Sequence, residues 1–135
     1  MTPLTFGYMG KIFHVDLSSE QFEIKKLDLD AACAYLGGLG LNAWLMEQTY
    51  ETGTAPLSPD NPIILGAGPL VATGTPGAAK IVATTYFPLN GTISESVGSM
   101  GFALNLKGAS RYSKNRILGV YKRMSRLTRD HNLYI

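Results

Sequence analysis

The sequence is poor in the residues that usually bind metals: its 135 residues include one cysteine, Cys33, and two histidines, His14 and His131. A single thiol excludes an internal disulfide, and alone it cannot hold a zinc ion or an iron–sulfur cluster. Neither histidine has a second ligand at metal-binding spacing, so we interpret both as solvated or turn residues. Cys33 lies between two alanines and is interpreted as buried helix packing. With no nucleophile–base pair in the sequence, we predict no catalytic residue and no metal site. The lone thiol fits a reducing, cytoplasmic compartment.

Long hydrophobic runs are also missing. The stretch PIILGAGPLVATG is interrupted by glycine and proline, and it falls short of the roughly 20 apolar residues that span a bilayer. The first residues, MTPLTFGYMGK, lack a basic segment followed by an apolar run, so we expect no signal peptide. We also expect no membrane partner. Because 45% of the residues are hydrophobic and 16% are charged, the composition is that of a globular domain.

Charge is unevenly distributed along the chain. Residues 1–106 carry nine acidic side chains and four lysines, a net charge of −5, whereas residues 107–135 carry eight cations and one aspartate, a net charge of +7. We therefore treat residues 110–135 as a divergent basic tail. Its tyrosines interleave with arginine and lysine, a pattern that can stack on nucleic-acid bases, although such a run is more often a solvated face.

Hydrophobic periodicity predicts an α+β fold, with antiparallel hairpins and short helices rather than regular β–α–β alternation. Asp28 or Asp30 is placed to cap the first helix, and the pair Gly37–Gly38 should end it. One face of the second helix is expected to hold Leu41, Trp44, Leu45 and Gln48. The expected strands span residues 10–19, 21–27, 62–68, 80–87 and 91–97, and the expected helices 29–36, 41–50 and 101–107. Near the C-terminal end of the sequence, the pattern is compatible with a strand at residues 117–121 and with a basic helix at residues 121–132, and it does not decide between them.

The stretch GAGPLVATGTPGAAK, residues 66–80, contains almost no large side chain and ends in a single cation, Lys80. Glycine and alanine let a ligand approach the main chain, and successive backbone N–H groups can form concave anion sites. A second small-residue segment, VGSMGF, follows at residues 97–102. These segments suit a flat, phosphate-bearing ligand. Simple turns between strands would have the same composition, and neither GxGxxG nor GxxxxGK[ST] is present.

Four segments follow one another in the chain: GYMGKIFHVDLSS, YLGGLGLNAWLM, PLSPDNPIILGAGPLVATGTPGAAK and FPLNGTISESVGSMGFALNLK. In order and spacing they resemble the N-terminal domain of the tungsten-dependent aldehyde ferredoxin oxidoreductase family. That family's pattern runs as a GxxGKIxxVDL opening, a GGRGL turn, PLSPENPLIxxxGPLTGTxAPTxGR, and SPLTG…SNxGGxFGxELKxAGYD. The resemblance covers residues 7–109, so we expect residues 1–109 to form a domain of this type, followed by the basic tail.

The resemblance implies a β-rich base domain for a tungsten or molybdenum cofactor held by two pterin dithiolenes. Lys80 stands where the family has an arginine and would neutralise a pterin phosphate. Val97 replaces an asparagine of the family pattern, and Leu39 replaces an arginine. The cofactor-binding residues implied in this way are Lys80, Gly77, Ala78, Ala79, Val97, Gly98 and Ser99.

The family reaction oxidises an aldehyde to a carboxylic acid and passes two electrons to ferredoxin, the expected electron acceptor. Family members carry the iron–sulfur cluster, the acid/base residues and the substrate channel in further domains, which have no counterpart here. We therefore expect the chain to be inactive alone, and to form a homo-oligomer or associate with a longer oxidoreductase subunit. The alternative is a non-enzymatic accessory module whose basic tail binds an acidic partner or nucleic acid. A change of reading frame would also explain the tail, which would then have no selected role.

Overall fold

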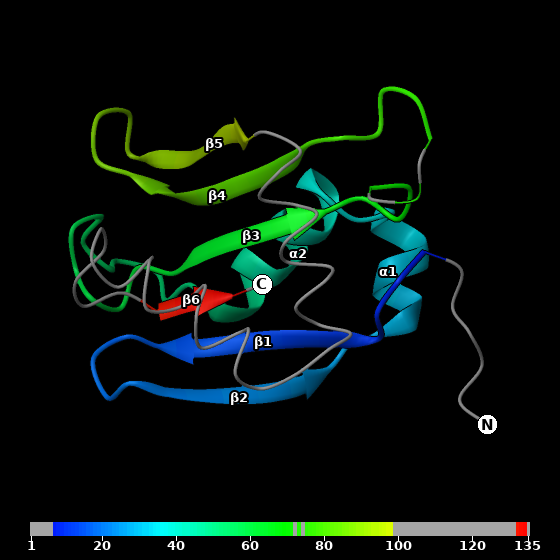
Figure 1. Cartoon of the computed structure of the whole chain (residues 1–135). Coiled ribbons are helices and arrows are strands. Elements are labelled where there is room, and N and C mark those ends of the chain that lie inside the picture. The colour runs from blue at the N-terminus through cyan, green and yellow to red at the C-terminus, as the bar shows by residue number, and fades with distance from the viewer. Residues whose placement is uncertain (1–6, 72, 74, 99–131, 135) are drawn as a thin grey trace.

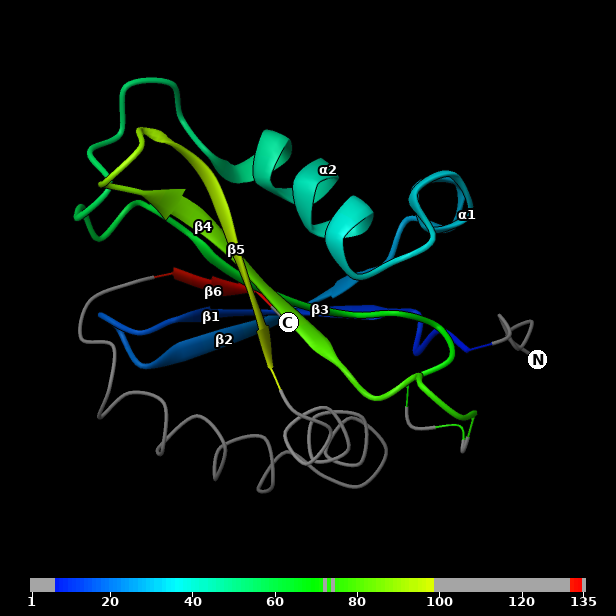
Figure 2. The ribbon, with the colours of Figure 1, turned by 90° about the horizontal axis from the view of Figure 1, so that it is seen from above.

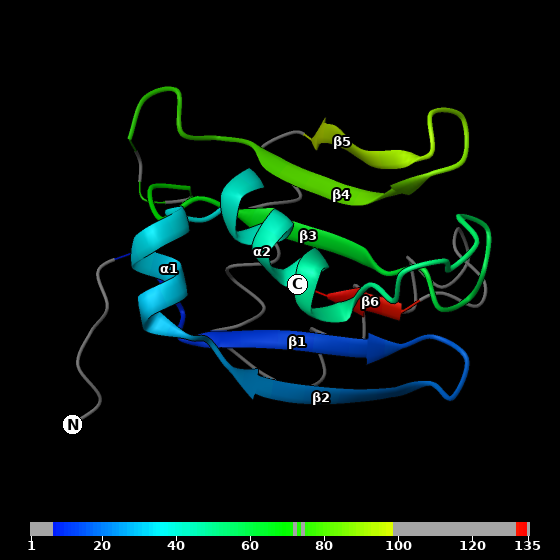
Figure 3. The same ribbon diagram turned by 180° about the vertical axis from the view of Figure 1, so that it is seen from behind.

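The structure, a computed structural model, describes residues 7–71, 73, 75–98 and 132–134. The strands of this part of the chain form one sheet in the order β2-β1-β6-β3-β4-β5 (Figure 1), and neighbours run antiparallel except for the parallel pair β3 and β6. Both helices lie on one face of this sheet (Figures 2 and 3), so the predicted α+β class is confirmed. The strands are β1 (Lys11–Asp16), β2 (Gln21–Lys26), β3 (Ile63–Ala67), β4 (Ile81–Phe87), β5 (Thr92–Gly98) and β6 (Asn132–Tyr134), and the helices are α1 (Leu29–Tyr35) and α2 (Leu39–Thr49).

The β1–β2 hairpin forms where the alternating pattern predicts it. Val15 is buried and pairs across the hairpin with the partly buried Phe22. The turn is closed by Asp16, whose carboxylate accepts hydrogen bonds from the backbone N–H of Ser18 (2.9 Å) and Ser19 (3.2 Å) and from the Ser19 hydroxyl (2.6 Å). These bonds, with the Ser19 hydroxyl first among them, lower the pKa of Asp16 because they stabilise the carboxylate.

The helix boundaries follow the predicted signals at one end only. Asp28 caps α1, and its carboxylate accepts hydrogen bonds from two first-turn amides at 2.9 and 3.2 Å. The predicted end at the glycine pair is wrong by one residue, because Leu36 adopts the left-handed conformation (φ 57°) that closes α1. Gly38 serves instead as the N-cap of α2, so α2 begins at Leu39, two residues earlier than expected.

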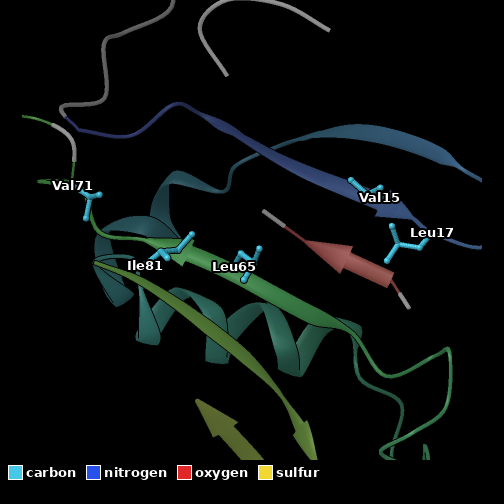
Figure 4. Close-up of a cluster of buried hydrophobic side chains, with 5 residues drawn as sticks. All are labelled: Val15, Leu17, Leu65, Val71 and Ile81. Atoms are coloured by element: carbon cyan, nitrogen blue, oxygen red, sulfur yellow. The ribbon is translucent and has the colours of Figure 1, made fainter. Parts of the chain in front are cut away.

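Two apolar clusters lie on opposite faces of the sheet, as expected when successive strand residues alternate. The cluster under the helices holds Ile12, Leu27, Ala32, Met46 and Ile64. The cluster on the other face holds Val15, Leu17, Leu65, Val71 and Ile81 (Figure 4). The sheet is therefore apolar on both sides, and the helices cover one of them.

The buried line along α2 differs from the predicted face. Asn42 and Met46, four residues apart, are the buried side chains of this helix, at 2% and 1% exposure. The predicted set is only partly correct, since Leu41, Trp44 and Leu45 are partly buried and Gln48 is exposed. The physical reason is that Gly66 on β3 has no side chain, which lets α2 approach the sheet through Asn42.

Three further predictions need correction. Cys33 is exposed rather than buried, because Ala31 and Ala32 are the α1 residues that face the core. His14 lies within β1 and is half-buried, so it is not a turn residue. Asn132 belongs to strand β6 and not to a basic helix. The expected helix at 101–107, the strand alternative at 117–121 and His131 lie outside the described residues. Within the described ranges, no helix has the length and apolar character needed to cross a bilayer.

Candidate functional site

Segments that are far apart in the sequence meet at one end of the sheet. β3 ends at Ala67, β4 begins at Ile81 and β5 ends at Gly98. The strand register pairs Ala67 with Ile81 and Ile81 with Gly98, so these residues form one row across three strands. Because residues 77–80 lead directly into β4, the row brings this segment beside the end of β5.

The turn between α1 and α2 packs against the same end of the sheet. Gly37 (φ 94°) permits a close approach, because a Cβ at this position would lie 3.1 Å from the carbonyl oxygen of Ala67 and 3.4 Å from Cα of Gly68. Gly38 (φ 55°) begins α2, and a Cβ there would lie 4.0 Å from the backbone nitrogen of Gly68. We call this part of the molecule the glycine-rich end, defined by residues 37–40, 66–68, 77–80 and 97–98.

Backbone lines much of the glycine-rich end. Gly77 is exposed with φ 78°, and a side chain there would meet no atom within 4 Å. Ala78 and Ala79 are partly buried and present only methyl groups. At Gly98, a Cβ would come within 2.9 Å of the Ile81 side chain, so the row across the strands depends on glycine here. Ser99, the remaining residue implied by resemblance, lies outside the described residues.

Three side chains give the glycine-rich end its chemical character. Lys80 is exposed and is the single charged residue in its four segments. Val97 is 58% exposed and Leu39 is 46% exposed, although both are apolar. The predicted site residues within the described ranges thus lie at one end of the sheet, around a single cation with apolar neighbours. Such an arrangement can bind an anion through Lys80, with the main chain of the small residues open to close approach.

The groups with displaced pKa values lie at the opposite end of the sheet. Asp16 ends β1, which runs antiparallel to β3, and Tyr50 follows α2. Burial, and then the neighbouring Tyr86, raise the pKa of Tyr50. The rings of Tyr50 and Tyr86 stack with centroids 4.8 Å apart, a packing contact of the fold. Among the described residues, no three His, Cys, Asp or Glu side chains gather in a group that could hold a metal ion.

Comparison with known proteins identifies the family. The family model for the aldehyde ferredoxin oxidoreductase N-terminal domain matches residues 12–117 of the chain. The chain belongs to the aldehyde ferredoxin oxidoreductase family. This match extends eight residues beyond the boundary at 109 that the sequence motifs predict.

The chain is similar to part of several longer members of the aldehyde ferredoxin oxidoreductase family. It is 32% identical over 105 residues to the tungsten-containing aldehyde ferredoxin oxidoreductase of Pyrococcus furiosus, and 29% identical over 105 residues to that of Thermococcus kodakarensis. Each match covers 76% of this chain and 17% of the relative, so the chain spans about a sixth of their length. A solved structure, the active site complex BamBC of benzoyl coenzyme A reductase with 1,5-dienoyl-CoA, has a similar fold. Its TM-score is 0.68 at 28% identity, over 76% of this chain and 16% of that one.

Asn42 is the buried residue of this region that sequence reasoning missed. It lies in the second turn of α2, and its side chain contacts both β3 and β4. The available signal was an asparagine inside the otherwise apolar run LNAWLM, together with a glycine in the middle of the strand IILGA. A buried polar side chain needs hydrogen-bonding partners, and a strand glycine often marks the close approach of another backbone or side chain.

Proposed function

We propose that this domain is the base on which a tungsten or molybdenum bis-pterin cofactor rests, and that the glycine-rich end is the contact surface. The observation that carries the proposal is the row Ala67–Ile81–Gly98, which brings the segments 77–80 and 97–98 together on an accessible part of the molecule. Tungsten is named in the relatives from Pyrococcus and Thermococcus, which supports the choice of cofactor class.

The glycine-rich end suits a large flat anion in two ways: its small residues leave the main chain accessible, and Lys80 supplies a positive charge. The ammonium of Lys80 would pair with a pterin phosphate, and the segment 77–79 would let the pterin approach the main chain. Val97 and Leu39 would pack against the ligand without hydrogen bonds. When bound, such a cofactor supplies two-electron oxidation of an aldehyde to a carboxylic acid.

The remaining parts of the reaction require more polypeptide than is described here. Because the chain spans 17% of its relatives, we propose that the iron–sulfur cluster and the substrate channel belong to a longer oxidoreductase polypeptide that associates with this domain. Ferredoxin would accept the electrons there. Size-exclusion chromatography with light scattering tests this association, and a monomer that persists in the presence of a longer family member contradicts it.

Cofactor content tests the proposed base function directly. The full chain is coexpressed with pterin-cofactor assembly proteins, and tungsten, molybdenum and oxidised-pterin fluorescence are measured per folded chain. Lys80→Ala should retain roughly tenfold less cofactor, since one charge-assisted hydrogen bond contributes about 1.5 kcal/mol. Lys25→Ala removes an exposed lysine on the edge strand β2 and is the matched control, with retention expected to be unchanged. Absence of metal and pterin from the unmodified chain would refute the proposal.

A further inference from the structure

Asn42 is a buried polar residue that joins α2 to two strands. Its side chain is 2% exposed, and its amide nitrogen donates hydrogen bonds to the hydroxyl of Thr84 at 2.9 Å and to the carbonyl oxygen of Val82 at 3.0 Å. The same nitrogen lies 3.4 Å from the carbonyl oxygen of Ile64. Because an amide has two hydrogens, the two shorter contacts satisfy both and tie the helix to β4, with β3 within reach.

The position of Asn42 depends on Gly66. A Cβ at residue 66 would overlap the side-chain oxygen of Asn42 and would lie 3.0 Å from the carbonyl oxygen of Gly38. Gly66 pairs with Val82, and Val82 with Val97, so the asparagine lies over a row of the sheet whose two outer residues belong to the glycine-rich end. The missing side chain lets the first turns of α2 lie against the strands.

Asn42 also lies close to the amino end of α2. Its backbone N–H donates to the carbonyl oxygen of Gly38 at 3.0 Å, which is the first hydrogen bond of the helix. The N-cap Gly38 has no side chain, so the turn 37–40 lacks a side-chain cap. The bonds from Asn42 to Val82 and Thr84 therefore connect the first turn of α2, which follows this turn directly, to the sheet.

We propose that Asn42 is a positioning residue: through its bonds to Val82 and Thr84 it holds the turn 37–40 in a fixed place beside residues 66–68 and Lys80, and ligand binding at the glycine-rich end depends on it. This inference rests on the proposed function for its ligand. Asn42 is buried, so its role is indirect. Its effect is to keep these separate segments in one arrangement.

A second buried asparagine provides a matched control at the opposite end of the sheet. Asn61 is 3% exposed, and its amide nitrogen donates to the carbonyl oxygens of Pro56 at 2.6 Å and Tyr86 at 2.8 Å. Replacing either asparagine with alanine removes similar bonds and should lower global stability comparably. A purely structural role for Asn42 predicts that the two variants behave alike in every other measurement.

The experiment compares the full chain with Asn42→Ala and Asn61→Ala under conditions in which circular dichroism shows all three folded. Hydrogen exchange read by mass spectrometry should be about tenfold faster at residues 38–42 and 66–68 in Asn42→Ala alone. Pterin and tungsten per folded chain, after coexpression with cofactor assembly proteins, should fall about tenfold in Asn42→Ala and stay within about twofold of the unmodified chain in Asn61→Ala. If Asn42→Ala does not fold, Thr84→Val, which removes one partner of the amide, should produce a smaller change at the same residues.

The outcomes separate this inference from the proposed function. Equal losses of cofactor in the two asparagine variants, or equal exchange at residues 38–42, overturn the positioning role. If the unmodified chain contains no cofactor, the proposed base function is overturned. The hydrogen-exchange pattern of the two variants then decides whether Asn42 positions the turn 37–40. Local exchange confined to the glycine-rich end in Asn42→Ala supports the positioning role, and exchange that rises uniformly refutes it.

Discussion

Gly66→Ala should destabilise the domain chiefly through a collision with the side chain of Asn42. The new methyl group would overlap the side-chain oxygen of Asn42, which cannot swing away without giving up its bonds to Thr84 and Val82. The backbone at residue 66 is outside the left-handed region, so alanine adds no strain of its own there. Overpacking of a well-filled site costs about 1–3 kcal/mol, and we expect about 2 kcal/mol, or roughly 6–8 °C in Tm.

A double-mutant cycle tests this cause. Asn42→Ala should cost about 2–3 kcal/mol, because it leaves buried acceptors without their donor. In that background the collision with the asparagine is gone and only the 3.0 Å contact with the carbonyl oxygen of Gly38 remains. Because alanine also restricts the unfolded chain, Gly66→Ala should then cost about 0.5 kcal/mol. The coupling of about 1.5 kcal/mol is measured by urea unfolding, followed by Trp44 fluorescence and far-UV circular dichroism. Gly68→Ala is the control, since a methyl there would meet only the Val71 side chain at 4.0 Å. Additive costs would show that the collision with Asn42 is not the cause.

Three further outcomes follow from contacts in the described residues. Met46 is 1% exposed on the buried face of α2, so Met46→Ala should lower the unfolding free energy by about 3 kcal/mol and Met46→Leu by under about 1.5 kcal/mol. Equal effects of the two substitutions in urea unfolding would contradict this packing. Asp28→Ala should cost about 1 kcal/mol through loss of the α1 cap, and Asp28→Asn only a few tenths, as read from thermal unfolding. Hydrogen bonds depress the folded pKa of Asp16, so its stabilisation is complete above the unfolded value near pH 4 and is lost as the pH falls through the lower folded value. Asp16→Asn should therefore weaken the acid dependence of the urea midpoint below about pH 4, and an unchanged dependence would exclude Asp16 as its source.

Local signals allowed much of the fold to be predicted from the sequence. The cap at Asp28 and the β1–β2 hairpin depend on residues a few positions apart, and the structure confirms both. The end of α1 was misplaced because the left-handed residue that caps the helix is Leu36, one position before the glycine pair. The face of α2 was only partly correct because burial of Asn42 depends on Gly66, which is 24 positions away and in another element. Contacts at such separations leave no periodic pattern in either segment.

In the candidate site, too, local features were predictable from the sequence and long-range contacts were not. Resemblance supplied its segments, and the turn at residues 88–91 already implied that the start of β4 would face the end of β5. The approach of the turn 37–40 to residues 66–68 could not be predicted in this way. It requires α2 to cross the strands at a particular place, and a buried asparagine and a missing side chain set that place.

The central position of β6 has a consequence for how the sheet is assembled. Within the described residues, β6 is the one strand between the β1–β2 hairpin and the β3–β4–β5 meander, and it follows β5 after a separation of more than 30 residues. During synthesis, both local units can fold before residues 132–134 leave the ribosome, and until then β1 and β3 each keep an open hydrogen-bonding edge. Hydrogen bonding of β6 to both edges requires contacts between residues far apart in the sequence, which form slowly relative to hairpins. The nascent chain is therefore most vulnerable to misassociation through these two edges before β6 emerges.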